Sequence, residues 1–163
     1  MTSIILNNPL ISVIIPTFNH GDYIEKAIDS VLQQSYKELE IIVVDDGSTD
    51  NTAGIILKYG ERIKYIRQRN GGGNAARNRG IRESRGELLA FLDADDFWEP
   101  NFLEEMVSFM KKENAELAYS NYARCDEKLV PKIADFTADK EVTFQNLLKT
   151  CRLSLLSSMY DSK

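Results

Sequence analysis

The chain has 163 residues, of which 43% are hydrophobic and 28% charged, and its formal net charge is −5. This length suits one domain with a sizeable core, and the composition is typical of soluble globular proteins, which excludes disordered, collagen-like and coiled-coil chains. The acidic balance argues against general nucleic-acid binding, and no apolar run approaches the roughly 18 residues that cross a bilayer. Because the first residues lack the basic start and apolar stretch of a secretory signal, we expect a cytoplasmic protein.

Strand and helix patterns alternate along the first two thirds of the chain, which predicts an α/β fold with a mainly parallel central sheet. The predicted strands cover residues 11–15, 39–44, 63–68, 88–92 and 116–122. The predicted helices cover residues 23–32, 49–59, 73–86 and 100–110. The later segments are predicted as a polar connection over 126–141, a short helix over 144–151 and a strand over 153–160. This last strand meets the chain end at once, so the closing element looks cut short.

Local signals set several of the predicted boundaries. Pro16 is expected to stop the first strand, because proline cannot donate a hydrogen bond within a central ladder. Asp22, with Glu25 three residues later, forms a capping-box pattern at the start of the first helix, whose apolar face begins at Tyr23. Gly60 is expected to follow the last turn of the second helix.

Polar residues follow three of the predicted strands. The three sets are Pro16, Thr17, Phe18 and Asn19, then Asp45, Asp46, Gly47 and Ser48, then Asp93, Ala94, Asp95 and Asp96. Each loop taken singly is an ordinary polar turn, but the carboxyl ends of parallel strands meet at one edge of the sheet, where ligands bind. Five carboxylates gathered there would repel one another unless a cation or a donor-rich ligand offset their charge. Since carboxylate oxygens are hard ligands, the cluster predicts a divalent metal, Mn²⁺ or Mg²⁺.

A basic segment lies between the second and third of these loops. Residues 58–85 carry a net charge of +7, whereas the rest of the chain carries −12. These side chains are interpreted either as solvated helix and strand faces or as a patch that faces phosphate. Glycines 71–73 precede a helix with Asn74 and Arg77 near its start, and helix N-termini bind phosphate readily. Metal, backbone amides and arginine together indicate a nucleoside-diphosphate site in which the metal assists a diphosphate leaving group.

Four motifs resemble those of family-2 glycosyltransferases of the GT-A fold, in order and in spacing. They are residues 12–19 (SVIIPTFN), 43–50 (VVDDGSTD), 74–80 (NAARNRG) and 93–96 (DADD). Their joint occurrence is a specific signal. The resemblance is strong over residues 10–122 and looser beyond, where the chain is similar to bacterial cell-surface polysaccharide and teichuronic-acid-type transferases. It implies a Rossmann-like three-layer domain over residues 1–163, with a nucleotide-sugar-binding part at 10–122 and an incomplete acceptor-side part at 123–163.

The resemblance also implies an activity. Such an enzyme transfers a sugar, with inversion, from a nucleotide-diphosphate donor, most often UDP-linked, to a saccharide or lipid-linked saccharide acceptor in cell-envelope polysaccharide synthesis. It would work in the cytoplasm at the inner face of the membrane, with at most peripheral attachment. The motifs specify neither the sugar, nor the acceptor, nor an oligomeric state.

Residue roles carry over from the family by position. The expected nucleoside-lining residues are Pro16, Thr17 and Phe18. Asp45 or Asp46 would hydrogen-bond the uracil. Asp93 and Asp95 would form the DxD pair, with Asp93 towards the ribose and Asp95 on the metal. The remaining expected binding residues are Asn19, Asn74, Arg77 and Ala94.

One family feature is missing from the sequence. The family's general base is an acidic residue well downstream of the DxD pair, and only 68 residues follow Asp95. The later acids are better interpreted as surface carboxylates: Asp126, Asp135, Asp139, Glu141 and Asp161. Inverting displacement needs a base opposite the leaving group, so we expect a C-terminally truncated chain whose base lies beyond its end. Such a chain would either transfer sugar or bind the donor and transfer poorly.

Two other functions compete with this interpretation. Residues 71–76 (GGGNAA) fit the dinucleotide-binding pattern, with Asp93 twenty residues after Gly73, so an NAD-dependent oxidoreductase is one alternative. Against it, the motif follows the third strand, not the first. A phospho-accepting receiver domain is another, but that fold needs a lysine at the end of a later strand, and the strand at 116–122 ends in Tyr-Ser-Asn-Tyr.

Two single residues near the motifs are open to interpretation. Trp98 follows the acidic loop and would either stack on an acceptor sugar or pack against the fourth helix. His20, the single histidine of the chain, lies in a polar loop and is expected to be exposed rather than to act as a base or ligand.

Overall fold

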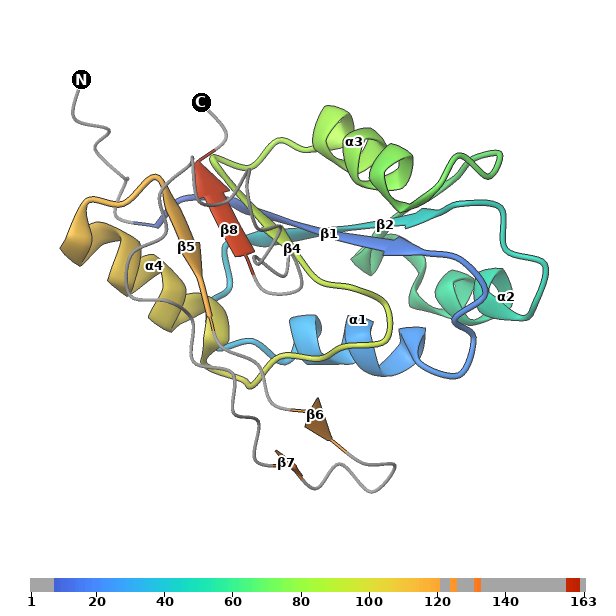
Figure 1. Cartoon of the computed structure of the whole chain (residues 1–163), viewed down its shortest axis with the longest axis horizontal. Coiled ribbons are helices and arrows are strands. Elements are labelled where there is room, and N and C mark those ends of the chain that lie inside the picture. Colours follow the sequence, from blue (N-terminus) through green and yellow to red (C-terminus); the bar gives the residue numbers. More distant parts are fainter. Residues whose placement is uncertain (1–7, 121–123, 126–130, 133–157, 162–163) are drawn as a thin grey trace.

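The chain folds into a layered α/β structure (Figure 1). The structure, a computed structural model, describes residues 8–120, 124–125, 131–132 and 158–161. These residues form a six-stranded sheet of order β3-β2-β1-β4-β8-β5 and a separate ribbon of β6 and β7. Helix α3 covers one face of the large sheet, and α1, α2 and α4 lie on the other. The predicted three-layer α/β fold is therefore confirmed.

The observed elements follow the predicted order closely. The strands are β1 (Ile11–Thr17), β2 (Leu39–Asp45), β3 (Lys64–Arg67), β4 (Leu88–Phe91), β5 (Leu117–Tyr119), β6 (Arg124–Cys125), β7 (Pro131–Lys132) and β8 (Ser158–Asp161). The helices are α1 (Ile24–Leu32), α2 (Thr52–Ile56), the 3₁₀ helix η1 (Leu57–Arg62), α3 (Gly73–Glu83) and α4 (Phe102–Glu113).

The sheet is mainly parallel. Strands β3, β2, β1 and β4 all run in the same direction, whereas β8 lies antiparallel between β4 and β5. β8 overlaps the strand predicted over 153–160, although residues 153–157 lie outside the described residues. The predicted helix over 144–151 also lies outside them, as does the connection over 126–141 apart from β7.

Both faces of the sheet are buried, which explains the continuous apolar runs of β1 and β2. Val13 and Ile15 belong to a large core shared with α1 and α4. Ile14 points to the opposite face, beneath α3. There a Cβ on Gly80 would collide with the Ile14 side chain, so a glycine is what allows α3 to approach β1 closely.

β1 continues through Pro16, so the prediction that Pro16 stops the strand is wrong. Residues two apart along a strand form hydrogen bonds on the same side, and the Ile14 carbonyl accepts from the Leu92 amide on the β4 side. The missing N–H of Pro16 therefore faces β4, whose pairing with β1 ends at Ile14 and Phe91. A proline at this position therefore removes no hydrogen bond between β1 and β4.

The start of α1 also differs from the prediction. The amides of Tyr23 and Ile24 donate to the His20 carbonyl at 3.0 and 2.9 Å, and no side chain caps the first turn. The expected capping box of Asp22 and Glu25 is therefore absent. Tyr23 is 55% exposed, so it lies outside the core in which it was expected.

The predicted second helix is shorter and divided. The amides of Thr49 and Asp50 donate to the Asn19 side chain, so the helix starts only at Thr52, whose amide donates to the Asp50 carboxylate at 3.0 Å. α2 then tightens into η1. Gly60 lies within η1 with a φ of 57° and a ψ of −134°, a non-helical conformation that glycine adopts readily, and it interrupts the helical turns there.

Candidate functional site

The predicted polar loops meet at one edge of the sheet. β1 lies between β2 and β4: the chain runs from β1 to β2 and β3 on one side and then crosses to β4 on the other. Ligands of open α/β sheets bind in the crevice at such a switch point. In Figure 1 the loops after β1 and β2 lie at the right-hand end of the sheet, near the loop that leads into α3, and the loop after β4 turns back below β1.

The loops after β1 and β2 are fastened to each other. The Asp46 amide donates to the Thr17 carbonyl at 2.8 Å, and the Asn19 amide donates to Ser48 Oγ at 2.9 Å. Asn19, with a φ of 56°, also accepts from the Thr49 amide at 2.8 Å. The Asn19 side chain was expected to bind the ligand, but in this structure it holds the two loops in place.

Two neighbouring residues leave functional groups available at this edge. Phe18 is 41% exposed although it is a large aromatic side chain. Thr17 is only 3% exposed, and its Oγ1 has no hydrogen-bond partner among the described residues. Buried hydroxyls are normally paired, so the Thr17 hydroxyl is a candidate contact for a polar group of a ligand.

Asp45 is part of the internal framework. Its carboxylate is fully buried and accepts hydrogen bonds from the Ser48 amide at 2.7 Å and the Tyr65 hydroxyl at 2.9 Å. Arg67 Nε lies 3.8 Å from Oδ2, the oxygen that also accepts from Tyr65. Burial, together with the neighbouring Asp45 carboxylate, raises the pKa of Tyr65 to about 12, so the hydroxyl remains a donor at neutral pH. These contacts leave Asp45 poorly placed to meet a ligand.

Asp46 binds the glycine-rich loop before α3. Its carboxylate, 2% exposed, accepts from Gln68 Nε2 at 2.8 Å and from the amides of Gly71 and Gly72 at 3.0 and 2.7 Å. The sequence suggested that these amides would bind phosphate, but they already have an anionic partner within the chain. Gln68 carried no sequence signal for this role, because the contact depends on how β2 and β3 lie in the sheet.

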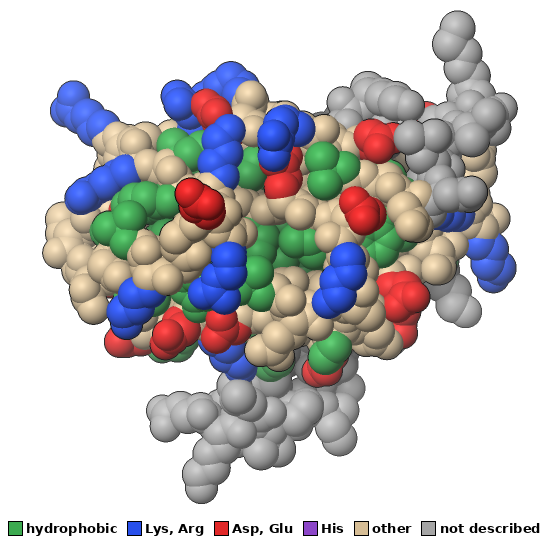
Figure 2. All heavy atoms as spheres, turned by 180° about the vertical axis from the view of Figure 1, so that it is seen from behind, with side chains coloured by type: hydrophobic (Ala, Val, Ile, Leu, Met, Phe, Trp, Pro, Cys, Tyr) green, Lys and Arg blue, Asp and Glu red, His purple; other side chains and the backbone are tan. Residues whose placement is uncertain are grey.

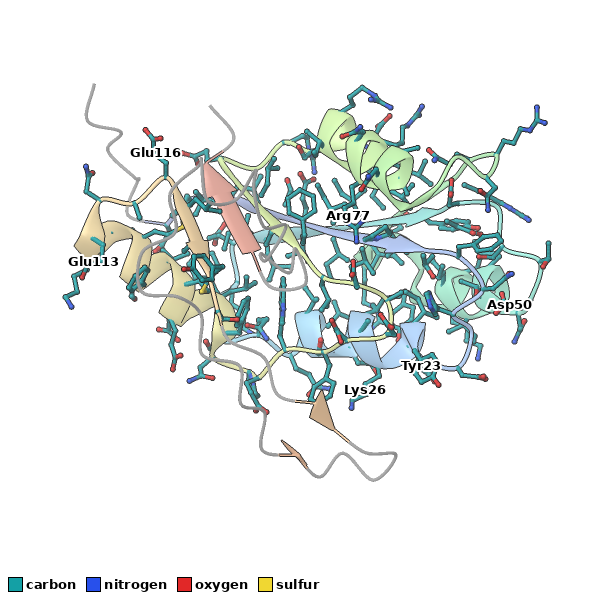
Figure 3. The ribbon with its side chains drawn as sticks, viewed as in Figure 1. Tyr23, Lys26, Asp50, Arg77, Glu113 and Glu116 are labelled. Carbon is teal, nitrogen blue, oxygen red and sulfur yellow. The ribbon has the colours of Figure 1, made fainter. Side chains whose placement is uncertain are left out.

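Arg77 connects α3 to the acidic loop after β4. Its Nη2 donates to Asp93 Oδ1 at 2.5 Å, and both side chains are 21% exposed. Arg77 Nε has no hydrogen-bond partner among the described residues. Figure 3 shows Arg77 reaching from α3 towards the strands. Asn74, also expected to bind the ligand, is exposed in the first turn of α3.

The acidic tetrad, residues 93–96, forms a tight turn closed by the Asp96 amide and the Asp93 carbonyl at 3.0 Å. Asp95 is exposed, whereas Ala94 is buried. Burial, with repulsion from Asp95 and Asp93, raises the pKa of the Asp96 carboxyl to about 6. The crowding of negative charge predicted from the sequence is therefore present within the tetrad.

The tetrad suits a divalent cation that takes only one or two ligands from the protein. In the part of the chain that the structure describes, no three acidic, histidine or cysteine side chains converge as a ready-made metal cage. Mg²⁺ and similar ions are commonly held by one or two carboxylates, with substrate phosphates and water completing the shell. Exposed Asp95, with Asp93 beside it, offers a donor set of this type.

The segment after the tetrad is anchored by Gln34, two residues after the end of α1, which sequence analysis missed. Gln34 is 1% exposed, donates to the Glu99 carbonyl at 2.7 Å and accepts from the Leu103 amide at 2.9 Å. Trp98 is 5% exposed and stacks on Phe102 at 4.5 Å between ring centroids. Of the two interpretations of Trp98, packing against α4 is therefore correct.

The basic segment does not form one phosphate-facing patch. Five of its cations are paired with acids: Lys64, Arg67, Arg77, Arg79 and Arg85. On the face shown in Figure 2, Lys and Arg side chains are interspersed with Asp and Glu. Among the paired cations, Arg77 reaches the acidic tetrad, and the others are better described as solvated faces.

Comparison with known proteins identifies the family. The family model for "Glycosyl transferase family 2" matches residues 12–151. The chain belongs to this family. The family assignment overturns the oxidoreductase and receiver interpretations. The fold agrees with this, because the glycine-rich loop follows the edge strand β3 and not β1.

Two curated relatives cover most of the chain. The Escherichia coli protein WfgD, named UDP-Glc:alpha-D-GlcNAc-diphosphoundecaprenol beta-1,3-glucosyltransferase, is 35% identical over 96% of this chain. A Bacillus subtilis protein, TuaG, whose name places it in teichuronic acid biosynthesis, is 36% identical over 94%. The chain spans 62% of the length of each.

Solved structures show the same fold. TarS 1–349 from S. aureus in complex with UDP-GlcNAc superposes with a TM-score of 0.74 at 26% identity, covering 94% of this chain and 45% of TarS. The GT-A architecture expected from the sequence is therefore confirmed. Across the described residues, no helix combines the length and apolar character required to span a membrane.

Proposed function

We propose that this chain binds a UDP-sugar and that the protein transfers the sugar, with inversion, to a saccharide or lipid-linked saccharide acceptor of the cell envelope. The observation that carries the proposal is the meeting of Thr17, Asp46 and the Arg77–Asp93 pair at the switch point of the sheet. Residues 10–122 would bind the donor, and residues 123–163 would begin the acceptor side. A lipid-linked acceptor, as in the name of WfgD, would place the protein at the inner face of the membrane.

The nucleoside would lie against the end of β1, lined by Pro16, Thr17 and Phe18. The unpaired Thr17 hydroxyl can bond a polar edge, and the exposed Phe18 ring can pack against a flat base. Asp45 or Asp46 would hydrogen-bond the uracil. Both carboxylates are already bonded within the chain, Asp45 to Ser48 and Tyr65 and Asp46 to the glycine-rich loop. The names of WfgD and the TarS complex support a UDP-linked donor.

The diphosphate would lie between the tetrad and α3. Asp95 and Asp93 would hold Mn²⁺ or Mg²⁺, which supplies positive charge to the departing diphosphate. Arg77 adds a fixed cation beside the same carboxylate, and its unpaired Nε is a donor already buried at the site. Asp93 would lie towards the ribose, and Ala94, which is buried, would keep the turn compact.

Transfer also needs a base on the acceptor side. Asp161 does not meet this need, because β8 pairs it with Leu88, at the amino end of β4. The tetrad follows the other end of that strand, about 10 Å further along. Asp126, Asp135, Asp139 and Glu141 lie outside the described residues. As the short stretch after Asp95 predicts, we propose that the base belongs to a part of the protein beyond these 163 residues. A donor-binding chain with poor transfer is the second candidate function.

Thermal unfolding with UDP, with and without Mn²⁺, tests the donor site. A ligand at 100 times its Kd stabilises the folded state by about 2.7 kcal/mol. We expect an Mn²⁺-dependent shift in Tm that Asp95→Ala abolishes and that the control variant Glu113→Ala, on the far helix α4, retains (Figure 3). A shift with NAD instead of UDP, or a UDP shift unaffected by Asp95→Ala, would contradict the proposal.

A further inference from the structure

The Asp46 carboxylate holds the amino end of α3. Two consecutive backbone amides, Gly71 and Gly72, and the Gln68 side chain all donate to it. Asp46 is 2% exposed, so the accepting carboxylate is removed from water although the two glycines are exposed. A buried anion at a helix N-terminus is favoured both by its hydrogen bonds and by the helix dipole.

This contact fixes the first turn of α3. Gly72 has a φ of 88°, which a residue with a side chain rarely adopts, and its carbonyl accepts from the amides of Ala75 and Ala76. Asp46 therefore binds the backbone at the residue where the helix begins. A Cβ on Gly73 would lie 3.2 Å from Arg77 Nη1, so the loop also packs against Arg77 itself.

The other end of this short connection is the Arg77–Asp93 pair, at 2.5 Å. A continuous series of contacts thus runs from Asp46 through Gly72 and the first turn of α3 to Arg77 and Asp93. These contacts connect the nucleoside part of the proposed donor site with its diphosphate part.

We propose that Asp46 is a positioning residue, which sets the placement of Arg77 and Asp93 by anchoring α3. The inference rests on the proposed function only in taking Asp93 as part of the donor site. A residue that contacted the base alone would affect the nucleoside end. Asp46 acts on the diphosphate end as well, so both parts of the donor depend on one buried carboxylate.

Asp46→Asn is the informative change, because it keeps the shape but replaces one acceptor oxygen with an NH₂ donor. That donor faces an N–H group of the glycine loop, which leaves a buried polar group unpaired. Asp50→Asn is the matched control. Asp50 lies on the same edge but bonds Gly21 and Thr52, away from α3 (Figure 3).

Hydrogen exchange of the free chain tests the positioning directly. We expect the amides of Ala76, in α3, and of Asp96, in the tetrad, to exchange at least tenfold faster in Asp46→Asn and to be unchanged in Asp50→Asn. An Asp96 amide that exchanges at the wild-type rate in Asp46→Asn would overturn the proposal. If Asp46→Asn fails to fold, Gln68→Leu, which removes one donor to the carboxylate, is expected to accelerate the same two amides by a smaller factor.

Calorimetric binding of Mn²⁺–UDP and of Mn²⁺–pyrophosphate separates positioning from base contact, since pyrophosphate has no base. We expect Asp46→Asn to weaken both ligands, pyrophosphate by at least fivefold. If Asp46→Asn weakened UDP binding but left pyrophosphate binding unchanged, Asp46 would contact only the base, and the positioning role would be refuted. If the wild-type chain binds neither ligand, the proposed donor site fails, and the exchange rates of the free chain still decide whether Asp46 positions Arg77 and Asp93.

Discussion

Glu40, at the start of β2, ties together segments that are distant in sequence. Its carboxylate accepts from Ser12 Oγ of β1 at 2.6 Å, and from the Arg85 amide and Nε at 2.6 and 3.0 Å. Ser12 Oγ in turn accepts from the Gly86 amide at 2.8 Å. Replacing Glu40 by Gln keeps the size but removes the charge from this junction of β1, β2 and the chain leading into β4.

The expected loss of stability follows from the exposure of the partners. The Arg85 side chain is 78% exposed, so its ion pair contributes little. The Glu40 side chain is 12% exposed, and hydrogen bonds to a charged acceptor contribute about 1.5–3 kcal/mol. Because glutamine can still accept one of them, we expect Glu40→Gln to lower the free energy of unfolding by about 1.5–2.5 kcal/mol. For a chain of this size that corresponds to a fall in Tm of about 3–10 °C.

The effect should depend on pH. Burial raises the pKa of the Glu40 carboxyl, but hydrogen bonds from Ser12 and Arg85 and the charge of Arg85 outweigh it, so the pKa in the folded chain lies below its usual value. A lowered pKa contributes stability that is present above the unfolded pKa and is lost as the pH falls through the folded pKa. Wild type and Glu40→Gln should therefore differ fully at pH 7, and the difference should shrink as the pH falls from about 4 through the lower pKa of the folded chain.

Urea unfolding followed by circular dichroism at pH 7 and pH 3.5 measures both effects. Glu38→Gln, an exposed glutamate two residues earlier, is the control and should change neither value appreciably. If Glu40→Gln lowered the free energy of unfolding equally at the two pH values, or did not lower it at pH 7, the reasoning would be refuted. Once folded, Glu40→Gln should bind UDP as wild type does, because Glu40 lies at the amino end of β2, away from the switch point.

Three further substitutions test other parts of the structure by urea unfolding. Gly80→Ala should destabilise the chain by about 1–3 kcal/mol, since the new methyl group overlaps Ile14; a more stable variant would show that α3 is not packed this closely. Tyr65→Phe should cost about 1–2 kcal/mol by removing a donor to buried Asp45, and an unchanged midpoint would contradict that contact. Gln34→Ala should cost about 2–3 kcal/mol, because two backbone groups lose their partner, and a neutral result would argue against this anchor.

Much of the architecture follows from the sequence because it depends on local periodicity. The apolar run of β2 and the helical spacing of α4 predict these elements near their observed places. The positions of the acidic loops relative to the strand ends then place Asp46 and Asp93 at the same edge, because parallel strands all present their carboxyl ends there.

Tertiary structure decided which atoms of those loops remain available. Asp45 and Asp46 are adjacent in the sequence, and only the contacts with Tyr65 on β3 and with the loop before α3 show that both carboxylates are enclosed. In the same way, the glycine-loop amides looked free in the sequence because their partner, Asp46, lies 25 residues away along the chain.

The placement of β8 and of Pro16 was likewise decided by strand neighbours. A strand's sequence pattern records whether its faces are buried but not which strands lie beside it, so the insertion of β8 between β4 and β5 left no local signal. Pro16 is tolerated because β4 no longer pairs with β1 at that level. The sequence alone determined the elements and the residues gathered at the site, and the packing of distant segments determined which of them bind the chain itself and which face the crevice.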